Sequence, residues 1–384
     1  MSTTLTGLIP IIYTSLNAIS RELTGMIPSV TLDASASGAA VGQTVSSFVA
    51  PAASVGNITP GATPPDDGNQ TIGKVDIVID KARYAPFRWT GEQAASVGGD
   101  AAAQIQAAQI QQAMRALVNE IEADLCALYK YASRAAGAYN ATPFGTANDY
   151  THASLTRKIL ADNGAPLTDL QLVVDTAAGA NLRGKQAAAA DAGGDSILRQ
   201  GVLLDINGMA IRESAQIKTH TAGSMSGGST TGTHAVGATT LALKNATGTG
   251  TVAAGDVITI AGDTNQYVVT AASFAGANPA TGDTITIAAP GLRVGFTADK
   301  VITVVGSCVR NMGFAKSAII LAQRTPYLPG GDAAADEHIA TDPRTGLSFR
   351  VAAYKEHHRI KYQVECCWGV KLVKPEHTAL LLSA

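Results

Sequence analysis

The stretch DAAAQIQAAQIQQAMRALVNEIEADLCALYKYASRAA at residues 100–136 contains neither glycine nor proline and lies between Gly98-Gly99 and Gly137. Its apolar residues recur at steps of three and four, the spacing of one face of an α-helix. They are Ile110, Met114, Leu117, Ile121, Leu125, Leu128 and Ala132. The pattern predicts one helix of about 50 Å, at about 1.5 Å per residue, with Asp100 as its N-cap.

A stripe of this length also fits a coiled coil or a long bundle helix. The rest of the sequence offers no second helix of similar length and is dominated by strand-like segments. A single long helix among strands usually packs across a sheet. The sequence therefore favours a spine helix over a coiled coil.

The composition is apolar and weakly charged. Of 384 residues, 46% are hydrophobic and 15% are charged, whereas an average domain carries about 25% charged residues. A chain of this length suits two or three domains, each with its own core. Low charge combined with many small residues suits a protein whose surface is largely covered by copies of itself.

Charge, cysteine content and hydropathy exclude several classes of protein. The formal net charge is −2, so the clustered basic residues needed for nucleic-acid binding are missing. The four cysteines have no CxxC spacing and indicate reduced thiols in a cytosolic folding compartment. The N-terminus lacks the basic region of a signal peptide, and no apolar run approaches the ~18 residues of a membrane span, so we expect no membrane segment.

The N-terminal part is predicted to contain a short helix over 11–24 and then an extended arm. Residues 31–70 are rich in Ser, Ala, Gly, Thr and Pro and cannot bury a core of their own. We expect this arm to become ordered against another chain. Residues 71–81 alternate as a strand does and lead from the arm towards the long helix.

The central and C-terminal parts mix helices and strands. Asn207-Gly208, between two apolar runs in 202–213, specifies a tight hairpin. In the last long strand Cys366 is predicted to face the core and Cys367 the polar side. The predicted helices are 151–163, 176–190 and 314–323, and the predicted strands are 170–175, 301–305, 347–355, 360–373 and 378–382.

Composition changes near His220, where a segment rich in Gly, Thr, Ala and Asp begins and continues to about Gly291. Gly-Asp pairs stand at the strand ends, where turns are expected. The spacing predicts a small β-barrel or sandwich inserted into a larger domain. Its strand candidates are 239–244, 256–261, 266–271 and 283–288.

No set of side chains forms a recognisable catalytic or metal site. Cys126 belongs to the long helix and is interpreted as a packing residue, and Cys366 and Cys367 face opposite sides of a strand. Glu356-His357-His358 is interpreted as a solvated turn. The Gly-rich run 248–255 lacks the Lys-Ser/Thr of a phosphate loop, and the Gly-Asp turns lack the period of calcium-binding β-rolls. We therefore predict no catalytic residue, no metal, no cofactor and no enzymatic activity.

Four passages and the order of the parts carry a resemblance to a known family. The passages are KVDIVIDKARYAPFRWTGEQ at 74–93, LRQGVLLDINGMAIRESAQI at 198–217, AAGDVITIAG at 253–262 and NMGFAKSAIILAQRTPYLP at 311–329. Together they resemble the Hong Kong 97-type fold of tailed-phage major capsid proteins. The details are most similar to podovirus coat proteins of the "coat protein gene 5" type, which carry an insertion domain.

The resemblance implies an α+β fold with a long spine helix of about 100–136, an extended loop, peripheral and axial domains, and an inserted small β-barrel. The implied parts are an N-terminal arm at 1–30, an extended loop at 31–82, a peripheral domain at 83–165, axial segments at 166–219 and 301–340, an inserted β-domain at 220–300, and C-terminal strands of the peripheral domain at 341–384.

The resemblance also implies a function. Copies of the chain would form hexamers and pentamers that tile an icosahedral phage head, which encloses double-stranded DNA without sequence-specific binding. Fewer than about 75 residues precede the returning strand, so we expect a separate scaffolding protein as well as a portal. Assembly would take place in the host bacterial cytoplasm, and the mature location would be the virion.

Two other functions remain open. The same fold could form an encapsulin-like cargo compartment, although such shells generally lack an insertion of this kind. A β-rich adhesin or ligand-binding protein is a third alternative, which the long helix and the unpaired cysteines disfavour. A buried His–Cys or His–Asp contact would favour an enzyme instead.

Overall fold

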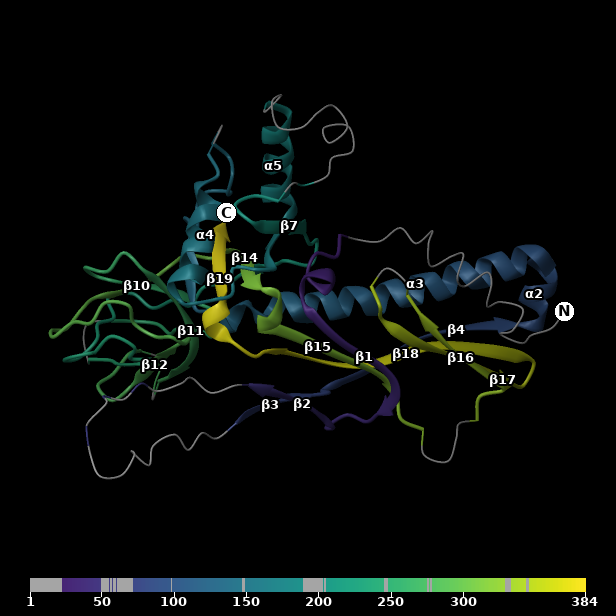
Figure 1. The fold of residues 1–384 in the computed structure, drawn as a ribbon. Helices are drawn as coiled ribbons and strands as arrows, with labels where there is room; N and C mark the ends of the chain where they lie inside the picture. Colours follow the sequence, from purple (N-terminus) through teal and green to yellow (C-terminus); the bar gives the residue numbers. More distant parts are fainter. Residues whose placement is uncertain are drawn as a thin grey trace.

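The computed structural model describes residues 23–49, 72–97, 99–146, 149–188, 205–244, 248–274, 278–328, 333–342 and 345–384, together with single residues 55, 57, 60, 203 and 276. The predicted helix over 11–24 and most of 50–70 lie outside these residues. The described chain is mixed α+β, with few helices and many strands. Its strands form two large sheets and a two-stranded ribbon (Figure 1).

The first sheet has six strands and is built around the long strand β18. Its members are β1 (Thr31–Ala39), β4 (Lys81–Thr90), β15 (Ile319–Pro326), β16 (Asp336–Thr341), β17 (Ser348–Glu356) and β18 (Arg359–Leu372). One side of β18 pairs with β4, and the other side pairs first with β17 and then with β15. β16 pairs with the outer edge of β17, and β1 pairs with the outer edge of β15. This side of the sheet is therefore forked into two branches, β17-β16 and β15-β1.

Helix α3 (Gly99–Cys126) packs across the first sheet. Every residue of the predicted stripe is buried, and the stripe shares a core with Tyr362 and Trp368 of β18. Figure 1 shows α3 running along the sheet that contains β4, β16 and β18. The long helix and its buried face are therefore confirmed, although both ends of the helix differ from the prediction.

The second sheet has eleven strands and joins strands of residues 220–300, the predicted insertion (called below the inserted segment), to the C-terminal strand. Its members are β5 (Arg134–Ala136), β6 (Leu170–Val174), β7 (Met209–Glu213), β8 (Thr219–His220), β9 (Thr240–Ala242), β10 (Val257–Ile260), β11 (Gln266–Ser273), β12 (Thr284–Ile287), β13 (Ile302–Val304), β14 (Cys308–Ala315) and β19 (Thr378–Ser383). Its main path is β13-β10-β11-β5-β19-β14-β6-β7, so the inserted strands meet the others at β5. β19, the last of the predicted C-terminal strands, lies between β5 and β14.

The long helix ends earlier than predicted. After Cys126 the chain forms a 3-10 turn, η2 (Ala127–Tyr131), and then strand β5. Arg134 and Ala135 pair with β11 on one side and β19 on the other, and these pairings replace helical hydrogen bonds. Gly99 is already helical, so Asp100 is not the N-cap.

Short helices fill the space around the sheets. They are α2 (Gly91–Val97), α4 (Thr151–Asp162), α5 (Thr176–Ala188), η1 (Ile27–Ser29), η3 (Lys316–Ala318) and η4 (Pro375–His377). α4 contacts β5, β14 and β19, and Leu160 shares a core with Leu172 and Leu381. α4 stops at Asn163-Gly164 as predicted, with Gly164 at a φ of +76°. No helix in the described ranges is long and apolar enough to cross a membrane.

All four strands predicted for the inserted segment are present, as β9 to β12. They enclose a core of their own that includes Leu241, Ile258 and Ile285. Val257 and Val268 point the other way, into the core under α3. The inserted strands therefore have a separate core and also share the core of the rest of the chain.

Two predictions in the C-terminal half are wrong. Residues 314–323 are not a helix, because β14 and β15 run through them with only η3 between. The segment is almost continuously apolar and buried on both faces, a pattern that helices and buried strands share. Cys367 was expected on the polar side and is 1% exposed, because Val45 and Ile79 cover that face of β18.

Asn207-Gly208 forms the predicted tight turn. Both residues have positive φ, +54° and +71°, as a type I′ turn requires. Ile206 bridges Met209 across it. The strand expected before the turn lies partly outside the described residues.

Candidate assembly surface

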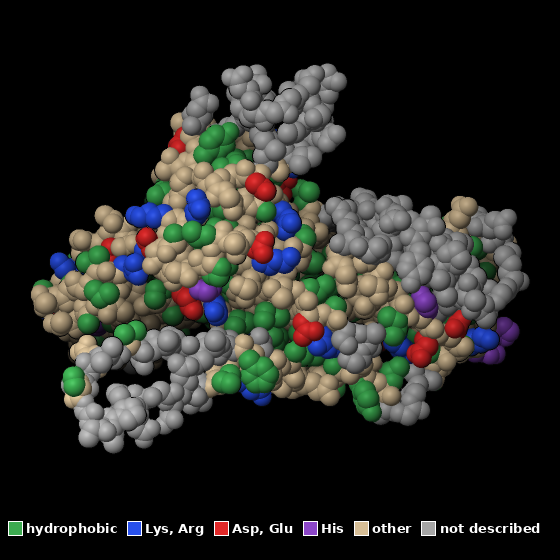
Figure 2. Space-filling view, in the orientation of Figure 1, with side chains coloured by type: hydrophobic (Ala, Val, Ile, Leu, Met, Phe, Trp, Pro, Cys, Tyr) green, Lys and Arg blue, Asp and Glu red, His purple; other side chains and the backbone are tan. Residues whose placement is uncertain are grey.

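The two-stranded ribbon carries several exposed apolar side chains. It consists of β2 (Thr44–Val49) and β3 (Gly73–Val78), paired in antiparallel register. Phe48 is 76% exposed, and Ile72 and Val78 are 67% and 46% exposed. In Figure 2 hydrophobic side chains stand out at the place where Figure 1 draws this ribbon. An isolated two-stranded hairpin is marginal in water, so these side chains lack the cover that would stabilise it.

The root of the ribbon is firmly attached to the first sheet. Two hydrogen bonds close the root itself: Gly42 N–H donates to the Ile79 carbonyl at 2.8 Å, and Ile79 N–H donates to the Gln43 carbonyl at 2.9 Å. Lys371 Nζ donates to the Asp76 carbonyl at 2.7 Å. A side chain on Gly369 would collide with the Val78 carbonyl, so glycine lets β3 cross β18 closely. The ribbon is thus fixed at one end and exposed at the other.

Part of this arrangement corrects the sequence prediction. The arm was expected to begin at residue 31, but β1 pairs in parallel with β15 as an edge strand of the first sheet. The exposed ribbon begins only at Thr44. Alternating Val75, Ile77 and Ile79 correctly indicated a returning strand, but nothing in the sequence distinguished β1 from the arm.

The first sheet has a depression of about 580 Å³ at its fork. Tyr327 and Ile339, which are 60% and 41% exposed, contribute apolar walls. Arg350 lies at the base and pairs with Glu337 at 2.6 Å and with Glu365. Burial of the guanidinium between two carboxylates fixes the base of the depression, while its rim stays apolar and open.

Away from the fork, the sheet carries an ordered aromatic and basic cluster. The ammonium of Lys361 lies 5.6 Å from the ring centroids of both Tyr84 and Tyr354. Tyr84 is 59% exposed. A cation held between two aromatic faces has little freedom, so this surface is pre-organised for contact.

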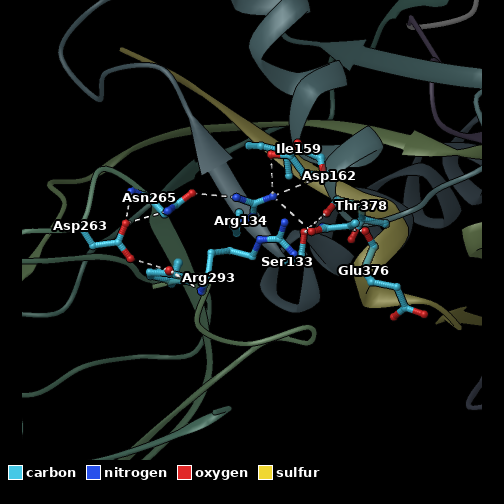
Figure 3. A network of polar contacts seen from close by, with 11 residues as sticks. Ser133, Arg134, Ile159, Asp162, Asp263, Asn265, Arg293, Glu376 and Thr378 are labelled. Atoms are coloured by element: carbon cyan, nitrogen blue, oxygen red, sulfur yellow. Dashed lines mark hydrogen bonds and ion pairs between the residues drawn. The ribbon is translucent and has the colours of Figure 1, made fainter. Parts of the chain in front are cut away.

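The inserted strands are fastened to the rest of the chain through Arg134 (Figure 3). Its guanidinium donates to Asn265 Oδ1 at 2.7 Å and to Asn163 Oδ1 at 3.2 Å, and it lies 3.5 Å from Asp162. Asn265 is held in turn by Asp263, which also accepts from the Tyr267 hydroxyl at 2.6 Å. Burial, followed by the nearby charge of Arg293, lowers the pKa of Arg134. One side chain therefore connects the inserted segment, α4 and β5.

A second junction contains a buried His–Asp contact, the feature that would favour an enzyme. His220 Nε2 donates to Asp256 Oδ1 at 2.8 Å, and the Tyr129 hydroxyl lies 2.8 Å from His220 Nδ1. Asp256 is fully buried and also accepts from Gly223 N–H and Ala253 N–H. Because a carboxylate only accepts, Nε2 carries the imidazole proton and Nδ1 accepts from tyrosine. Burial raises the pKa of Tyr129, so its hydroxyl is a poor nucleophile.

Arg310 lies beside this contact without an ion pair. It is 1% exposed, and its hydrogen bond is to the Cys308 sulfur at 2.7 Å. Its Nε and Nη2 atoms have no partner within the described chain. Burial lowers the pKa of Arg310 and raises the pKa of Cys308. Buried groups of this kind brace a junction between chain segments and offer no access to a substrate.

The remaining candidate residues are also unsuited to catalysis. All four cysteines are buried, and burial raises the pKa of Cys126 and Cys366 strongly and that of Cys367 to about 11. His357 and His358 lie at the tip between β17 and β18, with ring centroids 4.2 Å apart. Glu356 pairs with Arg359 at 2.5 Å. No group of three metal-ligating side chains occurs in the described ranges.

Sequence reasoning missed the residues that form these surfaces and junctions. Phe48 lies in a low-complexity stretch, and Arg134 and His220 come together with residues distant in sequence. Among these residues, only Asp256 could be singled out from the sequence, because it belongs to a Gly-Asp turn at the start of a predicted strand.

Neither known protein families nor curated proteins match the sequence. Comparison with solved structures finds phage capsids and a virus-like particle. A chain of Mycobacterium phage Che8 is 14% identical with a TM-score of 0.43, covering 96% of this chain and 90% of that one. A chain of the capsid of cyanophage P-SCSP1u is 14% identical with a TM-score of 0.49, covering 95% and 90%. A chain of a virus-like particle from Pyrococcus furiosus is 9% identical with a TM-score of 0.39, covering 98% of both chains.

Proposed function

We propose that the chain is the major capsid protein of a tailed bacteriophage, with a Hong Kong 97-type fold and an inserted β-domain. The observation that carries the proposal is the β2–β3 ribbon, which is anchored at its root and exposes Phe48 and Ile72 beyond it. A monomer would gain nothing from such an arm. An assembly of many copies gains one buried contact for every subunit.

The two surfaces of the first sheet support the same proposal. The depression has an apolar rim, and in the Lys361–Tyr cluster the ammonium lies between two aromatic rings. Surfaces of this kind, with aromatic side chains and a charged base already paired, suit repeated contacts between folded subunits. The net charge of −2 suits a shell that encloses double-stranded DNA without binding its sequence.

The finer parts of the proposal follow from the resemblance. Hexamers and pentamers would form the icosahedral shell, a separate scaffolding protein would guide its size, and a portal would occupy one vertex. The chain would assemble in the host cytoplasm and remain in the virion.

The test is electron microscopy of negatively stained protein, expressed alone and with a candidate scaffolding protein. We expect closed shells or curved sheets from the chain alone and shells of uniform size with scaffolding. Uniform shells that form alone around a second, enclosed protein would favour the cargo-compartment alternative. A monodisperse monomer in sedimentation at all concentrations would exclude any shell protein.

A further inference from the structure

Glu122 is a fully buried carboxylate on the spine helix α3. Its Oε1 accepts from Met26 N–H at 2.7 Å, and its Oε2 accepts from Ile27 N–H at 2.9 Å. The amide of Gly25 and the hydroxyl of Ser214 also donate towards it. Glu122 therefore holds the main chain of a segment almost a hundred residues away in sequence.

The segment it holds, residues 25–30, is a plug in the main core. Met26, Ile27 and Val30 are each no more than 2% exposed and pack beside Leu125 under α3. Gly25 fits tightly, since a Cβ there would approach the Glu213 carbonyl to 2.6 Å. Ser29 Oγ donates to the Gly25 carbonyl and accepts from Arg212 Nη1 at 2.9 Å. The plug leads directly into β1, the edge strand of the first sheet.

The charged side chains that the described part of the chain places on β7 near Glu122 are engaged elsewhere. On β7, Arg212 bonds to Ser29 and Gln171, and Glu213 pairs with Arg183 of α5. On α3, the Cys126 thiol contacts Ser214 Oγ at 3.7 Å, and burial raises its pKa. Residues 23–30 contain no charged side chain. The donors around Glu122 are thus amides and a hydroxyl, and the carboxylate has no cation beside it in the described structure.

We propose that Glu122 is a proton-dependent latch that sets how firmly residues 25–30, and with them the start of β1, are held on the spine helix. A carboxylate can accept all of these donors, but its burial without a cation is unfavourable. A protonated carboxyl removes the charge and keeps an oxygen that accepts from the main chain. The latch therefore has two closed forms of different stability. This inference does not depend on the proposed function.

Burial and hydrogen bonding at Glu122 set the direction in which docking of residues 25–30 changes with pH. Burial raises the pKa of Glu122, and the hydrogen bonds from Met26, Ser214, Ile27 and Gly25 offset it only in part. When docking of the segment raises the pKa of a carboxyl, the protonated carboxyl stabilises the docked state. This stabilisation is fully present below the pKa that the carboxyl has in the undocked state. That stability is lost as the pH rises through the docked pKa. Each unit of increase in pKa weakens docking about tenfold at high pH.

The experiment is hydrogen exchange with mass spectrometry on the full chain from about pH 5 to pH 9, corrected for the intrinsic exchange rate. In the wild type, we expect protection of the peptide covering residues 23–30 to fall by about tenfold or more as the pH rises. Glu122→Gln should show protection that does not vary with pH. The matched control Glu120→Gln, two positions away in a surface ion-pair cluster with Lys81 and Arg83, should follow the wild type.

Two outcomes would overturn the inference. One is wild-type protection that is constant over this range, and the other is a Glu122→Gln variant that keeps the wild-type pH slope. If Glu122→Gln does not fold, Glu122→Asp keeps the carboxylate and should keep the slope. A slope that persists in Glu122→Gln for peptides of β7 as well would assign the effect to Glu213 or Cys126 instead.

Discussion

Replacing Phe48 by alanine should weaken assembly without weakening the subunit. The ring is 76% exposed at one end of the ribbon, and a buried phenylalanine removes about 150–250 Å² from water. Covering the exposed part would therefore bury about 150 Å² and contribute about 3–4 kcal/mol per contact at about 25 cal/mol per Å². Loss of about 3 kcal/mol weakens each contact by roughly a hundredfold. The free subunit should change by less than about 0.5 kcal/mol, because an exposed side chain contributes little to folding.

The assay measures the protein concentration at which light scattering first rises, with electron microscopy of the product. We expect the threshold for Phe48→Ala to be at least tenfold above that of the wild type, with an unchanged thermal unfolding midpoint. Phe48→Leu should fall between them, and Leu167→Ala, a side chain 50% exposed away from the ribbon, serves as the matched control. An unchanged threshold for Phe48→Ala would show that the ribbon stays exposed in the assembly and would refute its role.

Four further changes test the junctions by urea denaturation and the ribbon root by hydrogen exchange. Asp256→Ala leaves three donors without this acceptor, among them the buried His220, and should lower the free energy of unfolding by about 3–5 kcal/mol; a loss below about 1 kcal/mol would contradict its role. Arg310→Met should leave the free energy of unfolding unchanged or raise it by up to about 2 kcal/mol, because the Arg310 charge has no ion pair in the described structure. Arg134→Met should lower the free energy of unfolding by about 2–4 kcal/mol, because Asn265 and neighbouring acceptors lose their donor. Gly369→Ala should raise amide exchange across β3 while leaving α3 protected, since only the ribbon is displaced.

The spine helix could be predicted because one local pattern determines it. Its apolar stripe is the face that packs on β18, and no distant residue changes the spacing. Its end could not be predicted, because the residues after Cys126 obey the same periodicity. The chain leaves the helix there because Tyr129 meets His220 and Arg134 meets Asn265, and both partners lie in the inserted segment. Tertiary contacts thus override helix propensity at this position.

The segment 314–323 shows the opposite case, in which the local signal was ambiguous. Ala, Leu and Lys favour a helix, but every residue of 311–315 is buried, as is Ile319. Burial on both faces suits a strand between two neighbours, and β14 has β19 on one side and β6 on the other. The prediction that Cys367 lies on the polar face was wrong for a related reason. The ribbon that covers this side chain begins more than three hundred residues earlier in the chain.

The two buried junctions differ in what they do for the chain. At Arg134 the guanidinium is shared among α4, β5 and the inserted strands, so its loss weakens a junction that the β5–β11 pairing and the Gln266 hydrogen bond to the Gly137 carbonyl still hold. At Arg310 the charge sits beside the Asp256 hub and pairs with neither carboxylate nor carbonyl in the described structure. The first arrangement specifies where the inserted strands lie, and the second adds a charge that a methionine could replace. The position of the inserted strands therefore depends on β5, the segment in which the helical stripe ends, rather than on the inserted core alone.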